Sequence, residues 1–600
     1  MHILFSIAIS LLSVVAVAQP ARYTVSNIHA HNDYEKPFPF KQAYNAGVGS
    51  IEADVFLTAD GLLVAHDSIQ LLSKRTLEVL YLKPLACYIQ QHHGHPYADS
   101  TASLQLMIDI KTAAVPALDA LIQLLQQYPA IIQCPQVTIV ISGNRPEPET
   151  YTKYPSWIGF DGELRKTYSA VALSRIVMMS DNFKAFSSWN GKGIIPAVEK
   201  KQIDAVISNA HALQKKVRFW NAPDEVNAWF RLIHLQVDYI NTDKVAELSK
   251  FMVQLPVNTY TATQTYQLYR PAYRTDAVNK KVKNVIILIG DGMGLPQLYV
   301  GYTANKAALN IFNMRSSGLS KTSSYDSFIT DSAPGSTAIS SGKKTNNRAV
   351  GVDHTGAPLT LLPTIFAKRK KKTGLVTCGD ITDATPADFY AHQSERSSST
   401  AILADLQNAD VDILMGSRND TSIAALKALQ QTFSIVASTE QVTDAVRKWI
   451  VIEPRAGLSM LKGRGDWLSK AFDKTSKILS ANKEGFLMML EGAQIDHGGH
   501  ANNLPYVVTE VMDFDKVVGK ALQFADADGE TLVIVTADHE TGGLTLLDGD
   551  YTKGYVGGQF ATTDHTALPV TVFAYGPRSY LFTGVYENTE IFRKILEALK

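Results

Sequence analysis

The sequence predicts an α/β protein whose parallel strands carry functional residues at their carboxyl ends. Three stretches share one layout, an unbroken apolar run that stops at a carboxylate or a Gly-Asp pair: Asn284–Gly294, Gly485–Glu491 and Thr531–Asp538. Strands buried on both faces have this pattern because helices cover both sides of a parallel sheet. In open α/β sheets, ligands bind just beyond the carboxyl ends of the strands. An ordinary Asp-Gly turn is the alternative interpretation of Asp291 taken alone.

The length and charge of the chain bound its organisation and its partners. A chain of 600 residues is too long for one core, so we expect more than one domain. Lysine plus arginine, at 57, equals aspartate plus glutamate, at 57. No overall field therefore attracts nucleic acid, which we do not expect as a partner, or an anionic membrane.

The first residues predict export. Residues 1–18 are apolar from Ile3 onward and end in small residues before Gln19-Pro20. The run has the length of a signal-peptide core and is shorter than a membrane span of about 20 residues. We expect a cleaved signal and a periplasmic or secreted protein with no integral membrane segment, an uncleaved anchor being the alternative. Three widely spaced cysteines do not form a disulfide framework, and we expect all three to be buried.

The first domain, expected over residues 21–255, has a carboxylate pair at its centre. Glu52 and Asp54 are two apart on a predicted strand and therefore point to the same face. A hard divalent cation with oxygen ligands neutralises such a pair. His31 and His66 end predicted strands on either side, and histidines near such a metal suit acid–base catalysis at neutral pH.

The order His-x-His-Asn-Asp-Tyr, Glu-Ala-Asp-Val and Thr-x-Asp-Gly…His-Asp resembles the glycerophosphodiester phosphodiesterase and phosphatidylinositol-phospholipase-C superfamily. The closest part is its "altered inheritance of mitochondria"-like branch. The resemblance implies a (β/α)₈-type barrel that hydrolyses phosphodiesters. It implies that Glu52, Asp54 and Asp109 hold Mg²⁺ or Ca²⁺, that His31 and His66 are the catalytic pair, and that Lys111 contacts phosphate.

Alternatives for the barrel stay open. Commoner members carry His-Arg-Gly at the first motif, so the substrate is not fixed by the resemblance. A non-catalytic module that binds headgroups or glycans and a lyase that forms a cyclic phosphate are both compatible with the motifs. We expect His29 to be a packed or supporting residue, and residues 92–95 to form a surface loop because of their Gly and Pro neighbours.

Residues 256–281 are expected to be a linker, either extended or folded against one domain, and residues 282–600 a second domain. Ser332 precedes a plausible helix, where free N–H groups favour an anion. A bound metal can activate such a hydroxyl as a nucleophile. The alternative is a structural role, in which Ser332 or Asp331 only caps the helix. Asp496 and His500 are four apart, on one helix face, as mixed zinc ligands require.

The second domain resembles alkaline phosphatase in order along nearly its whole length. The motifs are Asp-Gly-Met-Gly, Thr-Asp-Ser-Ala, Asp-Ala-Thr-Pro-Ala, Glu-Gly-Ala-x-Ile-Asp-x-x-x-His, Thr-Ala-Asp-His-Glu-Thr-Gly-Gly and a late His-Thr. The resemblance implies a doubly wound α/β domain. It implies a first zinc on Asp496, His500 and His565, a second on Asp291, Asp538 and His539, Mg²⁺ on Asp291, Thr385 and Glu491, a nucleophile at Ser332 and a phosphate clamp at Arg396.

This sequence departs from the alkaline phosphatase pattern at a few positions, and these departures change what we expect of the third metal site and of the dimer. Asp383 stands where some members have histidine, which favours Mg²⁺ at the third site, and His497 stands where some have lysine. The short interval between Arg396 and Glu491 makes the usual homodimer possible but less secure. Hydrolysis of phosphodiesters or sulfate esters, as in cousins of the superfamily, is disfavoured by Ser332, Arg396 and the third-site ligands. We therefore expect a secreted bifunctional phosphoesterase acting on small phosphoesters.

Overall fold

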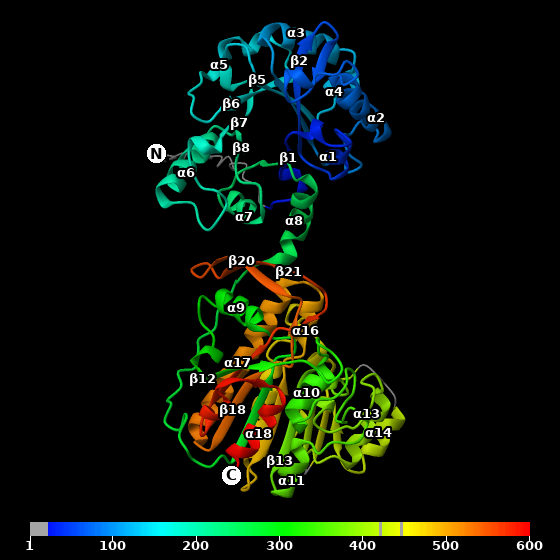
Figure 1. Ribbon diagram of the computed structural model, residues 1–600, viewed down its shortest axis with the longest axis vertical. Coiled ribbons are helices and arrows are strands. Elements are labelled where there is room, and N and C mark those ends of the chain that lie inside the picture. Colours follow the sequence, from blue (N-terminus) through cyan, green and yellow to red (C-terminus); the bar gives the residue numbers. More distant parts are fainter. Residues whose placement is uncertain (1–21, 419–422, 444–447) are drawn as a thin grey trace, which may run out of the picture. The chain divides into compact units, whose positions relative to one another are not determined.

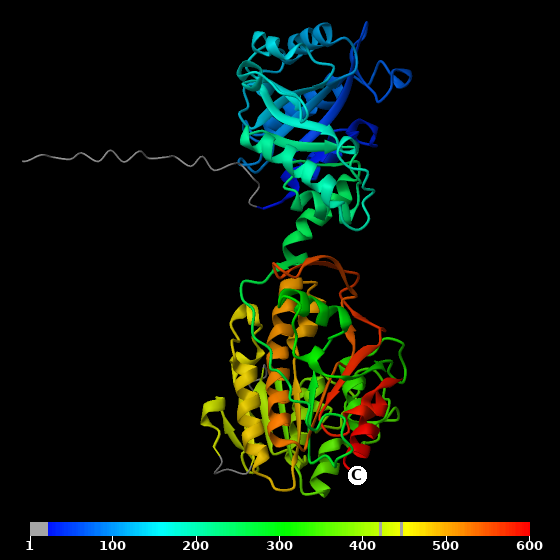
Figure 2. The same ribbon diagram turned by 90° about the vertical axis from the view of Figure 1, so that its left-hand side faces the viewer.

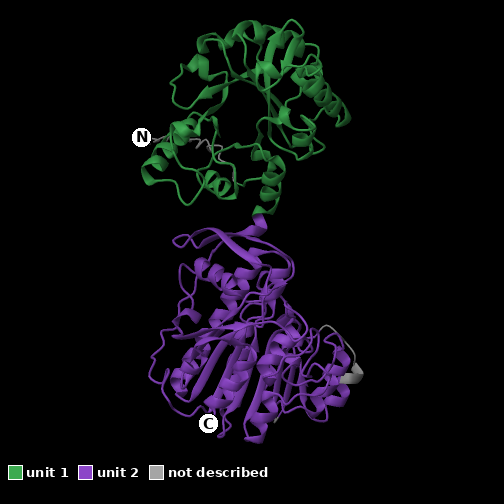
Figure 3. Cartoon of the chain, in the orientation of Figure 1, with its two compact units in different colours: residues 1–255 green, residues 256–600 purple. Residues whose placement is uncertain are grey.

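The computed structural model describes residues 22–418, 423–443 and 448–600. The chain divides into two compact units, Met1–Leu255 and Pro256–Lys600 (Figure 3). The expected signal at residues 1–18 lies outside the described residues. Within the described part of the chain, every helix is too short or too polar to cross a membrane.

Unit 1 is a nearly closed barrel of parallel strands (Figure 1). The strands are paired in the order β8-β7-β6-β5-β4-β2-β1-β9, and a parallel bridge between Arg218 and Tyr239 connects the last strand region to the first. The (β/α)₈ prediction is therefore confirmed. The strands are β1 (Ile28–Ala30), β2 (Ser50–Thr58), β4 (Leu104–Ile110), β5 (Val137–Gly143), β6 (Ile158–Glu163), β7 (Ile176–Asn182), β8 (Lys216–Trp220) and β9 (Ile240–Thr242), with β3 (Gly61–Val64) antiparallel to β2.

Helices surround the barrel because each has one apolar face. In α3, Leu118, Leu121 and Leu125 are buried at helical spacing. Inside the ring, Met107, Val140, Met178 and Tyr239 pack together, so the barrel is filled by side chains. The helices are α1 (Lys41–Asn45), α2 (Lys83–Gln91), α3 (Ala114–Leu125), α4 (Pro129–Ile132), α5 (Ala170–Leu173), α6 (Ala197–Ala212), α7 (Val226–His234) and α8 (Val245–Asn258).

Unit 2 is built on a mixed sheet of ten strands in the order β15-β16-β14-β13-β17-β11-β18-β23-β12-β24. Neighbours are parallel except that β23 is antiparallel to β18 and to β12. The strands are β11 (Asn284–Ile289), β12 (Ser316–Lys321), β13 (Lys372–Asp380), β14 (Ile413–Ser417), β15 (Ser434–Val436), β16 (Trp449–Ile452), β17 (Phe486–Glu491), β18 (Thr531–Thr536), β23 (Val570–Tyr575) and β24 (Gly584–Glu587).

The central strand β11 is buried on both faces, as its unbroken apolar run predicts. Ile286 and Leu288 belong to one core cluster, and Val285, Ile287 and Ile289 to another. Figure 2 shows the orange α17 and yellow α15 on one side of the sheet and the red α18 on the other. The helices are α9 (Leu295–Ala304), α10 (Ser332–Ser341), α11 (Leu362–Lys368), α12 (Ala384–Ala387), α13 (Ser399–Asp405), α14 (Ile423–Leu429), α15 (Trp467–Ser480), α16 (Gln494–His500), α17 (Leu504–Asp528) and α18 (Thr589–Ala598).

Residues 256–281, expected to be a linker, pack within unit 2. Strand β10 (Thr259–Thr261) pairs with β21 (Tyr555–Phe560), which pairs with β20 (Leu544–Asp550). The hydroxyl of Tyr266 donates to Asp515 at 2.7 Å, and that of Tyr269 to Asp526 at 2.8 Å. The segment's tyrosines therefore anchor it to α17.

The cysteines are free, as expected, but only Cys134 and Cys378 are buried. The expectation that Cys87 is buried was wrong. It lies on the outer α2, whose buried positions are Leu85 and Ile89. Cys87 therefore falls between the positions that face the barrel.

Candidate functional sites

Three carboxylates gather on the adjacent strands β2 and β4. Asp54 and Asp109 are paired directly across the two parallel strands, and Glu52 lies on the same face of β2. One oxygen of each carboxylate lies within 4.8 Å of the others. Asp54 Oδ1 is buried and accepts no hydrogen bond. These donors fit a hard divalent cation, which takes carboxylate oxygens.

Two cations lie against these carboxylates: Lys111, which directly follows β4, and Arg218 on β8. Lys111 Nζ is 2.8 Å from Asp54 and 3.0 Å from Asp109, and Arg218 Nη1 is 2.8 Å from Glu52. Burial and the charge of Glu52 raise the pKa of Asp54 to about 6, although Lys111 opposes this. Burial raises the pKa of Glu52, but Arg218 and the hydrogen bond from His29 outweigh it, so that pKa is lowered.

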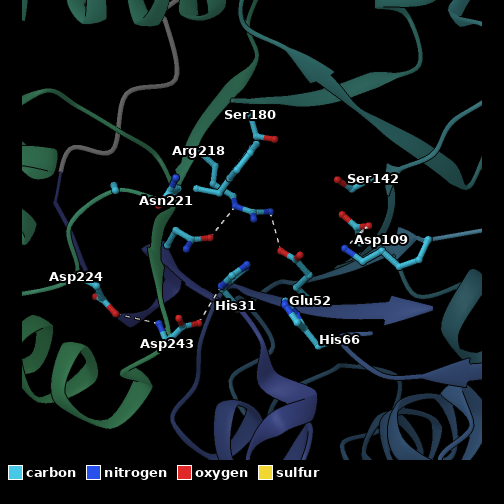
Figure 4. Close-up of a pocket in the computed structure, with 14 residues that line it drawn as sticks. His31, Glu52, His66, Asp109, Ser142, Ser180, Arg218, Asn221, Asp224 and Asp243 are labelled. Atoms are coloured by element: carbon cyan, nitrogen blue, oxygen red, sulfur yellow. Dashed lines mark hydrogen bonds and ion pairs between the residues drawn. The ribbon is translucent and has the colours of Figure 1, made fainter. Parts of the chain in front are cut away.

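The two predicted catalytic histidines line one pocket of about 500 Å³ with Glu52, Asp109 and Lys111 (Figure 4). His31 Nδ1 lies 2.9 Å from Asp243 Oδ1. Burial lowers the pKa of His31, but the hydrogen bond to Asp243 and the charge of Glu52 outweigh it, so the pKa is raised.

His66 follows β3, the antiparallel partner of β2, rather than a strand of the ring. The hydroxyl of Tyr34 lies 3.0 Å from His66 Nδ1 and 2.8 Å from Asp54 Oδ2, which links this histidine to the carboxylates. His29, expected to be a supporting residue, is fully buried, with Nε2 2.7 Å from Glu52 and Nδ1 2.8 Å from Ser50. It therefore orients Glu52.

In unit 2, the ends of adjacent strands bring a second set of predicted ligands together. Asp291 follows β11 and Asp538 and His539 follow β18, the parallel neighbour of β11. His539 Nε2 is 3.5 Å from Asp291 Oδ1 and 3.3 Å from Asp538 Oδ2. Asp291 Oδ1 and Asp538 Oδ2 are buried without a hydrogen-bond partner. Two such oxygens beside one imidazole fit a divalent cation of the zinc type.

The charge in this group is poorly compensated by the protein itself. Burial, and then the charges of Asp538 and Asp496, raise the pKa of Asp291 well above its ordinary value. Burial and the charge of Asp496 raise the pKa of Asp538 to about 6. Two bound metal ions would supply the positive charge that offsets both shifts.

The predicted ligands of the first zinc lie beside this group. Asp496 and His500 are one turn apart on α16, as the spacing predicts, and His500 Nε2 is 3.2 Å from Asp496 Oδ2. His565, on β22 (His565–Thr566), is 3.6 Å from Asp496 and 3.1 Å from His500, between Nε2 atoms. The hydrogen bond to Asp496 raises the pKa of His500 to about 9.

The third predicted set surrounds Glu491 at the end of β17. Burial, together with the charge of Asp383, raises the pKa of Glu491 to about 8. Hydrogen bonds from Thr377 and Thr385 act in the opposite direction. Thr385 lies in the short helix α12, and Ser336 of α10 donates to it at 3.4 Å. A buried carboxylate that has no cationic partner among the described residues, with a threonine oxygen beside it, offers the oxygen ligands that Mg²⁺ takes.

Ser332 occupies the first turn of α10, and its Oγ lies 3.2 Å from His539 Nε2. Asp331 is the N-cap and accepts from the Ala333 N–H at 3.4 Å, so the cap role falls to Asp331. Arg396 forms ion pairs through Nη1 with Asp331 and through Nη2 with Asp383, at 2.7 Å for the second. The guanidinium is thus aimed at the residue beside Ser332.

Several contacting residues were not predicted. In unit 1 they are Arg218, Tyr34 and Asp243. In unit 2 Thr541 Oγ1 lies 2.5 Å from Asp496 Oδ1 and 3.2 Å from His539 Nδ1, where it orients ligands of both zinc sets. Two features of the sequence could have indicated these residues: the Thr-Gly-Gly that closely follows His539, and the polar residues at the ends of β8 and β9. His497 is exposed, with Nδ1 3.2 Å from Gln494.

Family models match both units. The model for alkaline phosphatase matches residues 282–421 and 466–557. The model for an AIM6-like phosphodiesterase domain matches residues 21–130, and the one for the glycerophosphoryl diester phosphodiesterase family matches residues 216–246. A phosphodiesterase-like domain thus precedes the phosphatase domain.

Similar proteins are alkaline phosphatases. The chain is 30% identical to alkaline phosphatase H of Pseudomonas aeruginosa, over 55% of this chain and 87% of that protein. It is 33% identical to alkaline phosphatase 4 of Bacillus subtilis, over 44% of this chain but only 63% of that protein.

A solved structure, the alkaline phosphatase from the Antarctic bacterium TAB5, is 41% identical and has a TM-score of 0.50. The match covers 53% of this chain and 99% of that one. The predicted nucleophile, the phosphate-clamp arginine and all three ligand sets lie in the residues that the alkaline phosphatase model matches, apart from His565, which follows the last matched residue. The chain therefore belongs to the alkaline phosphatase family, and its second unit is a phosphomonoesterase domain.

Proposed function

We propose that the protein is a secreted bifunctional phosphoesterase, in which unit 2 works through a phosphoserine at Ser332 and unit 1 hydrolyses phosphodiesters. The observation that carries the first part is the position of Ser332 Oγ, 3.2 Å from a ligand of the buried Asp291–Asp538–His539 group. The small phosphoester enters with its phosphorus facing this hydroxyl.

The proposed cofactors of unit 2 are two Zn²⁺ and one Mg²⁺, on the ligand sets given above. Bound there, the zinc ions supply electrostatic stabilisation of the attacking and leaving oxygens of an in-line displacement. Mutants of the TAB5 enzyme in which a histidine is replaced by glutamate or aspartate are described with Mg bound in their M3 site. Asp383, standing where some members have histidine, supports Mg²⁺ at the third site of this chain.

Ser332 and Arg396 divide the work on the phosphoryl group. The oxygen of Ser332 forms the new bond to phosphorus as the bond from phosphorus to the ester oxygen breaks, and the proton that the hydroxyl gives up leaves with the alcohol. Arg396 offers two parallel N–H groups to non-bridging oxygens, a geometry that suits phosphate. Because Asp331 and Asp383 hold the guanidinium at both terminal nitrogens, it is oriented before substrate arrives. Water then hydrolyses the phosphoserine and releases phosphate.

For unit 1 we propose a phosphodiesterase that uses one Mg²⁺ or Ca²⁺ on Glu52, Asp54 and Asp109. The cation supplies charge stabilisation at the phosphate when bound. His31, kept protonated by Asp243, gives a proton to the departing alcohol oxygen, and His66 takes the proton of the attacking group. Lys111 and Arg218 supply positive charge toward the phosphate oxygens. Glycerophosphodiesters and inositol phosphodiesters are the proposed substrates.

A release screen on the full-length protein tests both parts. We expect Ser332→Ala to lose hydrolysis of p-nitrophenyl phosphate but keep that of bis-p-nitrophenyl phosphate, and His66→Ala to do the reverse. Each variant is the matched control for the other. Retained diester hydrolysis in both His31→Ala and His66→Ala would favour the alternative in which the barrel only binds a headgroup. A cyclic product from an inositol phosphodiester would identify a lyase.

The remaining expectations concern location and assembly. We propose a periplasmic or secreted enzyme, removal of residues 1–18, and no nucleic acid partner; a homodimer is possible. N-terminal sequencing of the exported protein and light scattering of the purified chain decide the processing and the oligomeric state.

A further inference from the structure

A second charged cavity, of about 470 Å³, lies in unit 2 away from the phosphatase site. Cationic side chains dominate its wall: Lys281, Lys283, Arg369, Lys371 and Lys483. The acidic lining residues are Glu484 and Glu530, and Lys280 already lies 3.7 Å from Glu530. The chain as a whole has no net charge, so this is a local concentration of positive charge.

The topology of the sheet explains why these cations meet. Lys281 and Lys283 precede β11, Arg369 and Lys371 precede β13, and Lys483 precedes β17. These strands are adjacent and parallel, in the order β13-β17-β11. Their amino ends therefore meet at one edge of the sheet, and Asp291 and Glu491 lie at the opposite edge. The cavity is separate from the phosphatase site.

Lys371 fixes the three loops to one another. Its Nζ donates to the carbonyl oxygen of Lys283 at 2.7 Å and to that of Glu484 at 2.5 Å. Burial and the neighbouring charge of Arg369 lower its pKa. The loops are thus held at fixed spacing even though like charges oppose the arrangement.

The five cationic side chains of the cavity outnumber the two carboxylates that line it. Over residues 22–418, 423–443 and 448–600, none of the five forms an ion pair, whereas Lys470, Lys520 and Lys553 elsewhere in the unit each have one. Like charges that share a cavity repel one another unless an anion enters. One multivalent anion reduces this repulsion more than one monovalent anion does, because it brings several negative charges into the cavity.

We propose that this cavity binds a small anion that carries several phosphate groups. Its volume falls in the range of small-molecule sites. The guanidinium of Arg369 suits bidentate contact with phosphate oxygens, and the lysine ammonium groups suit point contacts around it. This proposal does not depend on the activities proposed for the phosphatase site or the barrel site.

The test is calorimetric binding of myo-inositol hexakissulfate to the full-length, metal-loaded protein. This probe presents the charge pattern of a multiply phosphorylated anion but contains no phosphoester to hydrolyse. We expect the triple variant Lys281→Gln/Lys283→Gln/Lys483→Gln to weaken binding at least about tenfold at low ionic strength. The control Lys470→Gln/Lys520→Gln/Lys553→Gln, which removes three paired lysines, should change it less than about twofold.

Two further measurements make the result decisive. Hydrolysis of p-nitrophenyl phosphate should be unchanged in both triple variants, which shows that they fold. Saturating vanadate, which fills the phosphatase site, should leave probe binding intact. Equal affinity in wild type and the cavity variant, an equal loss in the control variant, or displacement of the probe by vanadate would each overturn the proposal.

Discussion

At Gly292 the backbone passes so close to Thr541 and to the proposed zinc ligand Asp496 that no side chain fits. Its φ is +69°, and a Cβ there would lie 2.7 Å from Thr541 Oγ1 and 2.9 Å from Asp496 Oδ1. We expect Gly292→Ala to displace Asp496 and to lower kcat/KM for p-nitrophenyl phosphate by about 100-fold. Zinc bound per chain, measured by mass spectrometry, should fall as well.

Gly356→Ala is the matched control for this substitution. Gly356 also has a positive φ, +89°, but nothing lies within 4 Å of its added Cβ. Its alanine variant carries the same kind of backbone strain without contact with a ligand. If both variants lost zinc equally, backbone strain rather than displacement of Asp496 would be the cause.

The pair His31–Asp243 predicts a pH effect in the barrel. Because Asp243 raises the pKa of His31, the imidazolium persists to higher pH, and a general acid is active only while protonated. In Asp243→Asn the ring should lose its proton at lower pH. The alkaline limb of kcat/KM for diester hydrolysis should then move to lower pH by up to about one unit.

Movement of the acid limb instead would identify His31 as the base. The phosphomonoesterase profile of Asp243→Asn serves as the internal control and should not change. The same variant thus separates a proton-transfer role of His31 from general damage to the protein.

Site residues that belong to a local sequence motif could be predicted from the sequence. Site residues contributed by a strand far along the chain could not. Glu52 and Asp54 are two apart on one strand, so their common face follows from the period of a strand. Arg218 comes from β8, far along the chain, and only closure of the barrel brings it within 2.8 Å of Glu52. No local pattern predicts such a contact.

Among the elements, α10 shows how local sequence sets chemistry. Asp331 caps the helix and binds Arg396, so one carboxylate both fixes the start of the helix and aims the guanidinium. The strands β11, β17 and β18 were predictable because each is a nearly continuous apolar run that lies within the predicted stretch. Residues 256–281 were not, because tyrosines that anchor a segment through hydroxyl groups have no apolar period.

The helix α17 contributes two carboxylates to a buried ionic group, which predicts a pH-dependent loss of stability. Arg464 Nη2 forms ion pairs with Glu510 and Asp513, at 3.0 Å for the second, and all three side chains are buried. Arg464→Met leaves two buried carboxylates without a cation, so the free energy of unfolding should fall by about 3–5 kcal/mol at about pH 8.

The sign of the pH dependence follows from the two carboxylates. Burial raises the pKa of Glu510 and of Asp513, and Arg464 opposes it. Without Arg464 both folded-state pKa values rise further above those of the unfolded chain, so the fold favours the protonated forms and loses stability as pH rises. Urea unfolding should therefore show a smaller deficit at about pH 5 than at about pH 8. Arg593→Met, which removes an exposed arginine paired with the exposed Glu590 and Glu597, should cost little at either pH.

For the whole molecule, the activities proposed for the two units can follow one another. A barrel that cleaves a diester to a monoester and an alcohol would supply the substrate class of unit 2. A mixture of two full-length variants tests whether the intermediate passes through solution. His31→Ala cannot cleave the diester, and Ser332→Ala cannot remove the phosphate, so neither alone should release phosphate from a glycerophosphodiester.

We expect the equimolar mixture to release inorganic phosphate after a lag, because the monoester made by Ser332→Ala reaches the intact unit 2 of His31→Ala by diffusion. Wild type at the same concentration of active sites sets the reference rate. A shorter lag in wild type than in the mixture would mean that the intermediate is transferred within one chain. If the mixture releases no phosphate while Ser332→Ala still produces the monoester, unit 2 does not accept that monoester and the sequential scheme fails. If Ser332→Ala produces none, the barrel is a binding module, and the two units do not act in sequence.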